Sequence, residues 1–153
     1  MSYKLVNGFI LGLVLVLMVD FLVFIGLKLH YFDALGIAEY FNVYFFDHQP
    51  FVLLGVCSLA LGFGMLYTRF AKKIQWAYLV VLGLSGLSLV EPVGMALGEQ
   101  FFLKPDQQFR IGTSVFRADL LYEGRHAIYV QRADIANTIR ILKTDVTWIQ
   151  EDF

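Results

Sequence analysis

Asp20 and Glu91 stand inside otherwise apolar stretches and are the residues best placed to do chemistry in this chain. An acid within a membrane helix faces a cavity, a partner or the protein interior, because an ion in hydrocarbon is costly. If both stretches are helices, each acid lies about seven residues from the same end, roughly 10 Å below one interface. Two acids at a shared depth would suit the handling of protons.

Pro92 follows Glu91 directly and should kink the helix that carries it. Proline lacks a backbone N–H, so the carbonyl of Ser88 loses its helical partner and leaves an irregular patch that water can reach. Three interpretations of the two acids stay open. We favour a structural role as protonated, hydrogen-bonded groups; the alternatives are pairing with a basic residue on a partner helix, and a proton or cation path.

Few other residues suggest chemistry. His30, His48 and His126 are isolated, and no cysteine or histidine lies at metal-ligand spacing from them. The sequence has no glycine-rich phosphate loop and no serine in an elbow motif, and its C-terminal basic residues alternate with acids instead of forming a nucleic-acid stripe. We therefore expect no enzyme activity, no cofactor, no metal ion and no nucleic-acid partner.

Three apolar stretches, residues 5–27, 49–68 and 74–98, are each long enough to cross a bilayer as a helix, which takes roughly 20 residues. Only 16% of the residues are charged, whereas soluble domains have roughly 25%. So short a chain could not hide three apolar helices in a core. The sequence predicts a three-helix transmembrane domain over residues 1–98, with membrane lipid as its first partner.

Small residues recur in these stretches with three residues between them, a spacing that lets helices approach closely. Their partners are either helices of the same chain, or helices of another membrane-protein subunit or of identical copies. The residues that we expect to pack against other helices are Gly8, Gly12, Ser58, Gly62, Gly83, Gly86, Gly94 and Gly98.

Residues 30–48 carry seven Tyr and Phe side chains. Aromatic rings prefer the headgroup level of a membrane, where the ring body is in apolar surroundings and a phenol meets water. We predict an interfacial helix over about residues 32–45, which sets the depth of the first two membrane helices. The alternative is a groove for a lipid or a partner.

Residues 99–153 have a different pattern, with apolar and charged side chains alternating along an extended segment. Phe116, Ala118 and Leu120 share one face, and Arg117 and Asp119 share the other. Further β-rich runs lie at 127–132, 138–142 and 146–149. The pattern predicts a small, water-exposed all-β domain of about five strands, which we expect to be a barrel of the SH3-like or Sm-like kind.

Basic residues predict the orientation of the chain. Arg69, Lys72 and Lys73 cluster between the second and third stretches, and Lys4 falls on the same side after two crossings. Positive residues near membrane ends stay in the cytoplasm. We therefore expect a multi-pass protein of a bacterial inner membrane, with a cytoplasmic N-terminus and residues 99–153 in the periplasm.

The segment Phe109–Val115 (FRIGTSV) is similar to the start of the β domain in small-conductance mechanosensitive channels. Residues 138–149 occupy the place of the later strands of that domain. A third helix rich in small residues that leads directly into a β domain also resembles the core of that family. The resemblance implies a homo-oligomer whose third helices line a pore.

The leading hypothesis for function is a non-catalytic accessory or scaffold subunit of a membrane or cell-envelope complex. Several faces suit close helix packing, and the terminal domain is too small for a substrate pocket. The alternative is a homo-oligomeric channel or ion-conducting protein that uses Glu91 and the glycine face of the third helix. A membrane-embedded enzyme that acts on lipid through Asp20 and Glu91 is a third hypothesis.

Overall fold

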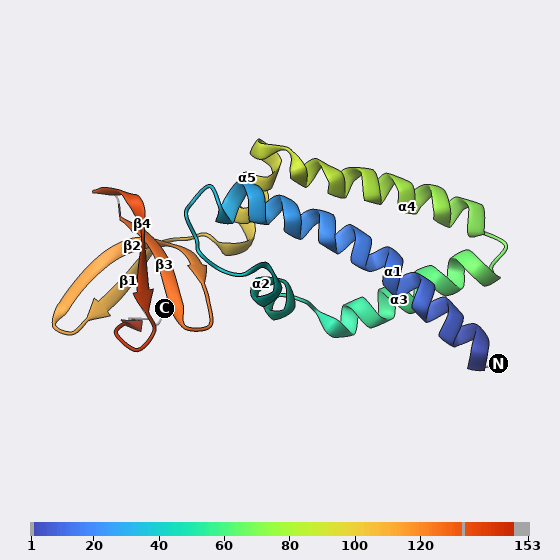
Figure 1. Ribbon diagram of the computed structural model, residues 1–153, viewed down its shortest axis with the longest axis horizontal. Helices are drawn as coiled ribbons and strands as arrows, with labels where there is room; N and C mark the ends of the chain where they lie inside the picture. The colour runs from blue at the N-terminus through green and yellow to red at the C-terminus, as the bar shows by residue number, and fades with distance from the viewer. Residues whose placement is uncertain (1, 133, 149–153) are drawn as a thin grey trace.

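A computed structural model of the chain describes residues 2–132 and 134–148, in which a group of helices leads into a β-sheet at one end (Figure 1). The N-terminus lies at the opposite end of the helices. The helical elements are α1 (Ser2–Leu27), a π-helical turn (Lys28–Phe32), α2 (Phe41–Asp47), α3 (Phe51–Tyr67), α4 (Ala71–Gly86), a 3-10 turn (Leu87–Leu89) and α5 (Glu91–Phe102).

One helix is long and apolar enough to cross a membrane by itself, the segment Tyr3–Phe32 made of α1 and the π-helical turn. Only 17% of its most apolar window is buried inside the protein, whereas the core helix of a soluble protein is mostly buried. α3 has 17 residues and is shorter. The three separate membrane spans expected from the sequence are not confirmed.

The third apolar stretch is two helices instead of one kinked helix. Ala71–Leu89 and Glu91–Phe102 qualify as a membrane span by length and composition only when taken as a pair, and they are bent by 93°. The break falls at Val90, whose backbone is extended. Pro92 follows in the first turn of α5, where its missing N–H has no helical acceptor to lose. Proline therefore starts a new helix here, and α5 leaves the end of α4 at nearly a right angle.

α1 and α3 pack against each other backbone to backbone. A Cβ atom built on Gly12 would overlap the carbonyl oxygen of Ser58 and lie 2.9 Å from the nitrogen of Gly62. A Cβ built on Gly62 would in turn overlap the carbonyl oxygen of Gly8. The small residues of the first two apolar stretches thus meet each other within one chain, because only glycine permits so close an approach.

The C-terminal part is an antiparallel sheet of five strands with the order β4-β3-β2-β1-β5. Its strands are β1 (Lys104–Ile111), β2 (Ser114–Glu123), β3 (Ala127–Arg132), β4 (Ile135–Leu142) and β5 (Thr147–Trp148). A β-bulge between Leu120 and Tyr122 shifts the register of β2 against β3. The bulge lets Leu121 and Tyr122 both join the cluster that faces the helices, while Leu120 packs in a second cluster with Phe109.

This sheet is open, so the SH3- or Sm-like barrel expected from the sequence is not confirmed. β4 and β5 stand at the two ends of the strand order, and closure would require pairing between those ends. Among the described residues, β5 pairs with Phe109 and Arg110 of β1 and with no other strand. The C-terminal antiparallel sheet itself is confirmed.

Gly12→Ala should weaken the contact between α1 and α3, because the added methyl group overlaps the Ser58 carbonyl. We expect the free energy of unfolding to fall by roughly 1–3 kcal/mol, the usual cost of overpacking. Gly55→Ala is the matched control on α3, since a Cβ there meets nothing within 4 Å. Thermal unfolding in detergent, followed by circular dichroism, measures both; equal melting temperatures would contradict this packing.

Candidate functional site

Asp20 lies between α1 and the start of α3, where its carboxylate accepts a hydrogen bond from the Gln49 side chain. The distance from Gln49 Nε2 to Asp20 Oδ2 is 2.7 Å, and Gln49 is buried with 7% of its surface exposed. Both line a small cavity of about 150 Å³ that also contacts Pro50 and Cys57. Within the helical part, Asp20 therefore has a neutral hydrogen-bond donor as its partner.

Glu91 occupies a different environment. It begins α5 and its side chain is exposed, with no hydrogen bond or ion pair to any residue that the structure describes. An acid in the first turn of a helix interacts favourably with the N-terminal end of the helix dipole. No contact joins Asp20 and Glu91 among the described residues, so the structure does not bring the two acids together as one site.

The small residues of the third stretch have two different surroundings. Gly94 and Gly98 are buried, and Gly98 lies against the ring of Tyr31. A Cβ atom built on Gly83 or Gly86 of α4 would meet nothing within 4 Å. Gly26, which the spacing rule did not single out, is a further close contact, because a Cβ there would overlap Ser88.

The helices and the sheet meet in one cluster of buried side chains, which we call the aromatic junction. Phe32 is fully buried there, and its ring centroid is 4.9 Å from that of Tyr122, in an edge-to-face arrangement. Such aromatic pairs add roughly 0.5–1.5 kcal/mol each beyond the area that they bury. The junction consists of Tyr31, Phe32, Ile37, Leu121, Tyr122 and Tyr129.

Hydrogen bonds cross the aromatic junction in both directions. The Tyr31 hydroxyl donates to the Leu121 carbonyl over 2.8 Å, and the Tyr129 hydroxyl donates to the Ala38 carbonyl over 3.3 Å. Burial raises the pKa of the Tyr122 phenol, and the nearby Glu39 and Asp47 carboxylates add to the effect. Tyr122 is therefore neutral at physiological pH, which suits its apolar surroundings.

An ion pair at the edge of the aromatic junction joins the β2–β3 turn to α2. Arg125, in the β2–β3 turn, donates from Nε to both carboxylate oxygens of Asp47, over 2.8 and 3.0 Å, and from a terminal nitrogen as well. Hydrogen bonding by Arg125 holds the pKa of the Asp47 carboxyl below its usual value of 3.8. A two-pronged pair of this kind fixes the orientation of the turn against α2.

The aromatic segment 30–48 thus divides its side chains between two environments. Phe45 is buried, while Tyr40 is 79% exposed and Phe46 is 56% exposed. The sequence predicted one interfacial helix with a belt of rings; in the structure α2 covers only Phe41–Asp47, and much of the segment packs against the sheet. Sequence reasoning missed the junction, since rings that face lipid and rings that face protein have the same local pattern.

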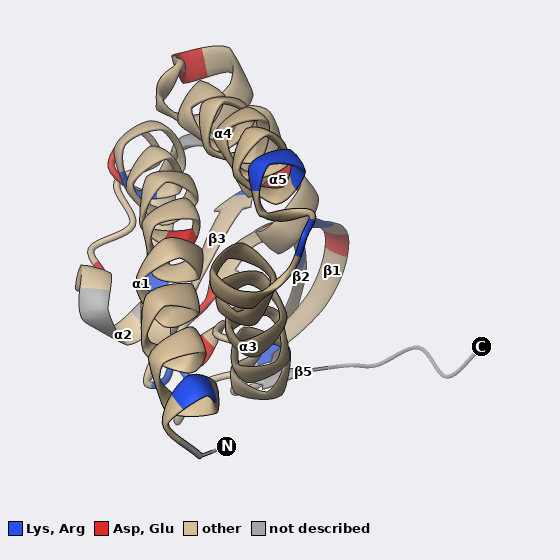
Figure 2. Cartoon of the chain, turned by 90° about the vertical axis from the view of Figure 1, so that its right-hand side faces the viewer, with Lys and Arg blue, Asp and Glu red and all other residues tan. Residues whose placement is uncertain are grey.

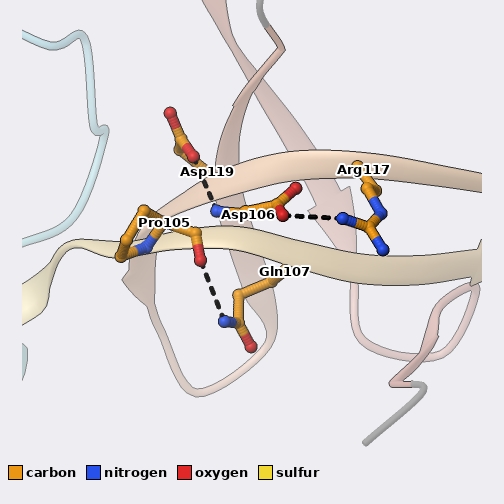
Figure 3. Close-up of polar contacts among 5 residues, drawn as sticks. All are labelled: Pro105, Asp106, Gln107, Arg117 and Asp119. Atoms are coloured by element: carbon orange, nitrogen blue, oxygen red, sulfur yellow. Dashed lines mark hydrogen bonds and ion pairs between the residues drawn. The ribbon is translucent and has the colours of Figure 1, made fainter. Parts of the chain in front are cut away.

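Polar side chains order the start of the sheet, where β1 leaves α5 (Figure 3). Asp106 has a left-handed backbone with φ of 52° at a register shift in β1. Its N–H donates to Asp119 over 2.8 Å, and its carboxylate accepts from Arg117 over 2.7 Å. Gln107 Nε2 also donates to the Pro105 carbonyl over 3.1 Å. These groups are exposed and contribute little energy, but they set the direction of β1.

Two of the three histidines, His30 and His48, make contacts between elements, whereas His126 is exposed. His30 Nε2 lies 2.8 Å from the Leu89 carbonyl, and the His48 ring stands edge-on to Phe102 with centroids 5.1 Å apart. Among the described residues, no group of three or more His, Cys, Asp or Glu side chains could hold a metal ion.

No protein-family model, curated protein or solved structure matches this chain. Its function is therefore argued from its own geometry.

The Asp47 carboxyl should titrate below 3.8 in the folded protein, because Arg125 stabilises its ionised form. The contribution of the pair to stability is then fully present above 3.8 and is lost as the pH falls through the lower folded pKa. Carboxyl ¹³C NMR in micelles measures this titration directly. Arg125→Gln should return the pKa towards 3.8, whereas Arg117→Gln, which removes a different ion pair, should leave it unchanged; an Asp47 pKa that ignores Arg125 would contradict the contact.

Proposed function

We propose that the chain is a multi-pass, non-catalytic membrane protein that serves as an accessory or scaffold subunit of a membrane or cell-envelope complex. The aromatic junction is the observation that carries this proposal. A sheet joined to its anchor by buried rings, hydrogen bonds and the Asp47–Arg125 pair is held in one orientation. A fixed orientation suits a protein that positions a partner. A sheet that was only tethered by a flexible linker would not need such contacts with the helices.

The outward side chains of the helices support a multi-pass arrangement. On α3, Val52 is 83% exposed, and on α4, Trp76 is 71% and Leu84 is 61% exposed. Apolar surface on this scale is unusual for a protein in water and is typical of one in lipid. At 1.5 Å per residue, α3 reaches ~26 Å and Ala71–Leu89 reaches ~28 Å, close to the ~30 Å hydrocarbon layer. α5 would then lie along the interface.

Charge supports the orientation. The first turn of α1 and the α3–α4 connection lie at the end of the helices far from the sheet (Figure 1), which is the end that faces the viewer in Figure 2. The cations of these segments, which we call the basic end, are Lys4, Arg69, Lys72 and Lys73. At the sheet end, by contrast, Lys28 is paired with Asp33. The positive-inside rule then favours a cytoplasmic N-terminus and α3–α4 loop, with the sheet in the periplasm of a bacterial inner membrane.

The sheet offers a surface on which a partner could bind. A groove of about 320 Å³ lies between the β1–β2 hairpin and β4, lined by Ile111, Phe116, Ile139 and Ile141 together with Arg132. The Arg132 guanidinium lies 5.9 Å from the Phe116 ring centroid. Apolar side chains with one arginine at the rim are the composition enriched at protein interfaces.

A homo-oligomeric channel is the second candidate, and one observation favours it. Gly83 and Gly86 leave open space on the outer surface of α4, so the backbone of another helix could approach there. A second copy of this chain could supply that helix. The mass of the detergent-solubilised protein separates a ring of copies from a monomer with a partner.

The proposed orientation predicts which cysteines are accessible. In a Cys57→Ala background, Thr113→Cys in the β1–β2 turn should react with a membrane-impermeant maleimide on right-side-out vesicles. Tyr3→Cys, at the opposite end of α1, should react only after permeabilisation. The reverse pattern would overturn the orientation, and equal reaction at both positions on intact vesicles would overturn the membrane-spanning arrangement.

The scaffold role predicts a partner at the sheet groove. A photo-reactive amino acid at position 139, inside the groove, should cross-link a distinct protein in native membranes. The same group at Glu123, exposed at the end of β2, is the matched control and should cross-link at least tenfold less. Cross-linking only to a second copy of the chain would favour the channel, and a monomer with no cross-link at either position would contradict both proposals.

A further inference from the structure

The basic end carries four cations and no acid to balance them. Lys4, Arg69, Lys72 and Lys73 form no ion pair with any residue that the structure describes. The acid nearest to Lys4 along α1 is Asp20, about four helical turns away. Elsewhere, five of the eight remaining basic side chains are paired with carboxylates: Lys28, Arg117, Arg125, Arg132 and Lys143.

Three of these cations lie over aromatic rings, although the cations repel one another. The Arg69 guanidinium is 4.9 Å from the Phe70 ring centroid, and Lys73 Nζ is 5.8 Å from the same centroid. Lys4 Nζ lies 5.7 Å from the ring of Tyr67 at the end of α3. Cation–π contacts hold positive groups in place but leave their charge uncompensated. A charged group of opposite sign would therefore be stabilised here.

An apolar groove begins next to this charge along α4. It has a volume of about 330 Å³ and is lined by Val16 and Val19 of α1, Leu61 of α3, and Ile74, Tyr78 and Val81 of α4. Ile74 directly follows Lys73 in the chain. The groove exists because α4 cannot lie as close to α1 as α3 does. Tyr78 stands between them, its hydroxyl donating to the Leu15 carbonyl over 3.1 Å.

From this juxtaposition we propose that the basic end and the groove together form a binding site for one anionic phospholipid. The phosphate contacts Arg69, Lys72 and Lys73, and one acyl chain lies in the groove beside Tyr78. Charge complementarity selects an anionic headgroup, since each cation near a membrane surface attracts anionic lipid. The nearly all-aliphatic lining selects a hydrocarbon chain and excludes a water-soluble ligand. The inference rests on the membrane location proposed above.

Native mass spectrometry of the detergent-purified chain tests the site with phosphatidylglycerol and phosphatidylcholine of identical acyl chains. The wild-type protein should retain phosphatidylglycerol at least tenfold better than phosphatidylcholine. Lys72→Gln with Lys73→Gln should remove most of that preference. The matched control, Lys104→Gln with Arg110→Gln, deletes the same charge at the sheet end and should preserve it.

A second pair of variants tests the groove. Val81→Phe fills the groove and should lower the retention of phosphatidylglycerol severalfold. Leu79→Phe is the matched control and should not, because Leu79 is about as exposed as Val81 (53% against 49%) but does not line the groove. If Val81→Phe has no effect, the lipid is held by surface charge alone and the two-part site is wrong. Equal retention of both lipids by the wild-type protein would also overturn the inference. A chain that stays soluble without detergent and retains neither lipid would overturn the membrane proposal itself.

Discussion

The close approach of other backbones to α1 is the constraint on which the rest of the structure depends. On α1, Gly8 and Gly12 allow α3 to approach closely, and Gly26 allows the 3-10 turn to approach at Ser88. In the membrane that we propose for this chain, the surroundings are as apolar as the side chains, so van der Waals contact and hydrogen bonds must hold the helices together. The Ser88 hydroxyl supplies such a bond, donating to the Leu22 carbonyl over 2.8 Å. α1 thereby becomes the axis to which α3, α4 and α5 are attached.

The same helix also determines how the sheet is held. α1 continues through the π-helical turn into Tyr31 and Phe32, which are fully buried between α5 and the sheet. Gly98 of α5 makes room for the Tyr31 ring, and the Tyr31 hydroxyl reaches the backbone of β2 at Leu121. Movement of the sheet relative to the helices would therefore expose several large rings and break the hydrogen bonds between them. The packing on which the proposed scaffold role rests therefore lies at the end of a single helix.

Local patterns predicted the features of this fold that depend on neighbouring residues. The long apolar run predicted the N-terminal helix, and the alternation around Phe116 and Leu120 predicted the sheet, because each periodicity belongs to one kind of element. The break at Val90 was not predicted in full, since Pro92 is compatible with a kink inside a helix as well as with the start of a new one. The open sheet and the aromatic junction depend on which segments meet in space. A single sequence contains no local signal for contacts between segments that are far apart in the chain. For the same reason, Asp20 and Glu91 were expected at a shared depth, yet each has its own surroundings.

The distribution of charge connects these observations. At the sheet end, most basic side chains are paired with carboxylates, as Arg125 is with Asp47, so that end gains specific geometry from its charges. At the other end, the cations stand over the rings of Tyr67 and Phe70 without acids. The ion pairs at the sheet end form within the chain, whereas the cations of the basic end need an anion from outside it. This difference between the two ends would suit a membrane whose two surfaces differ in charge. The sheet end would then be built to hold a protein partner in register, and the basic end to hold the chain against anionic lipid. The lipid contacts would set the depth and tilt of α1 and α4 in the membrane. A partner bound to the sheet would then be positioned by the same contacts.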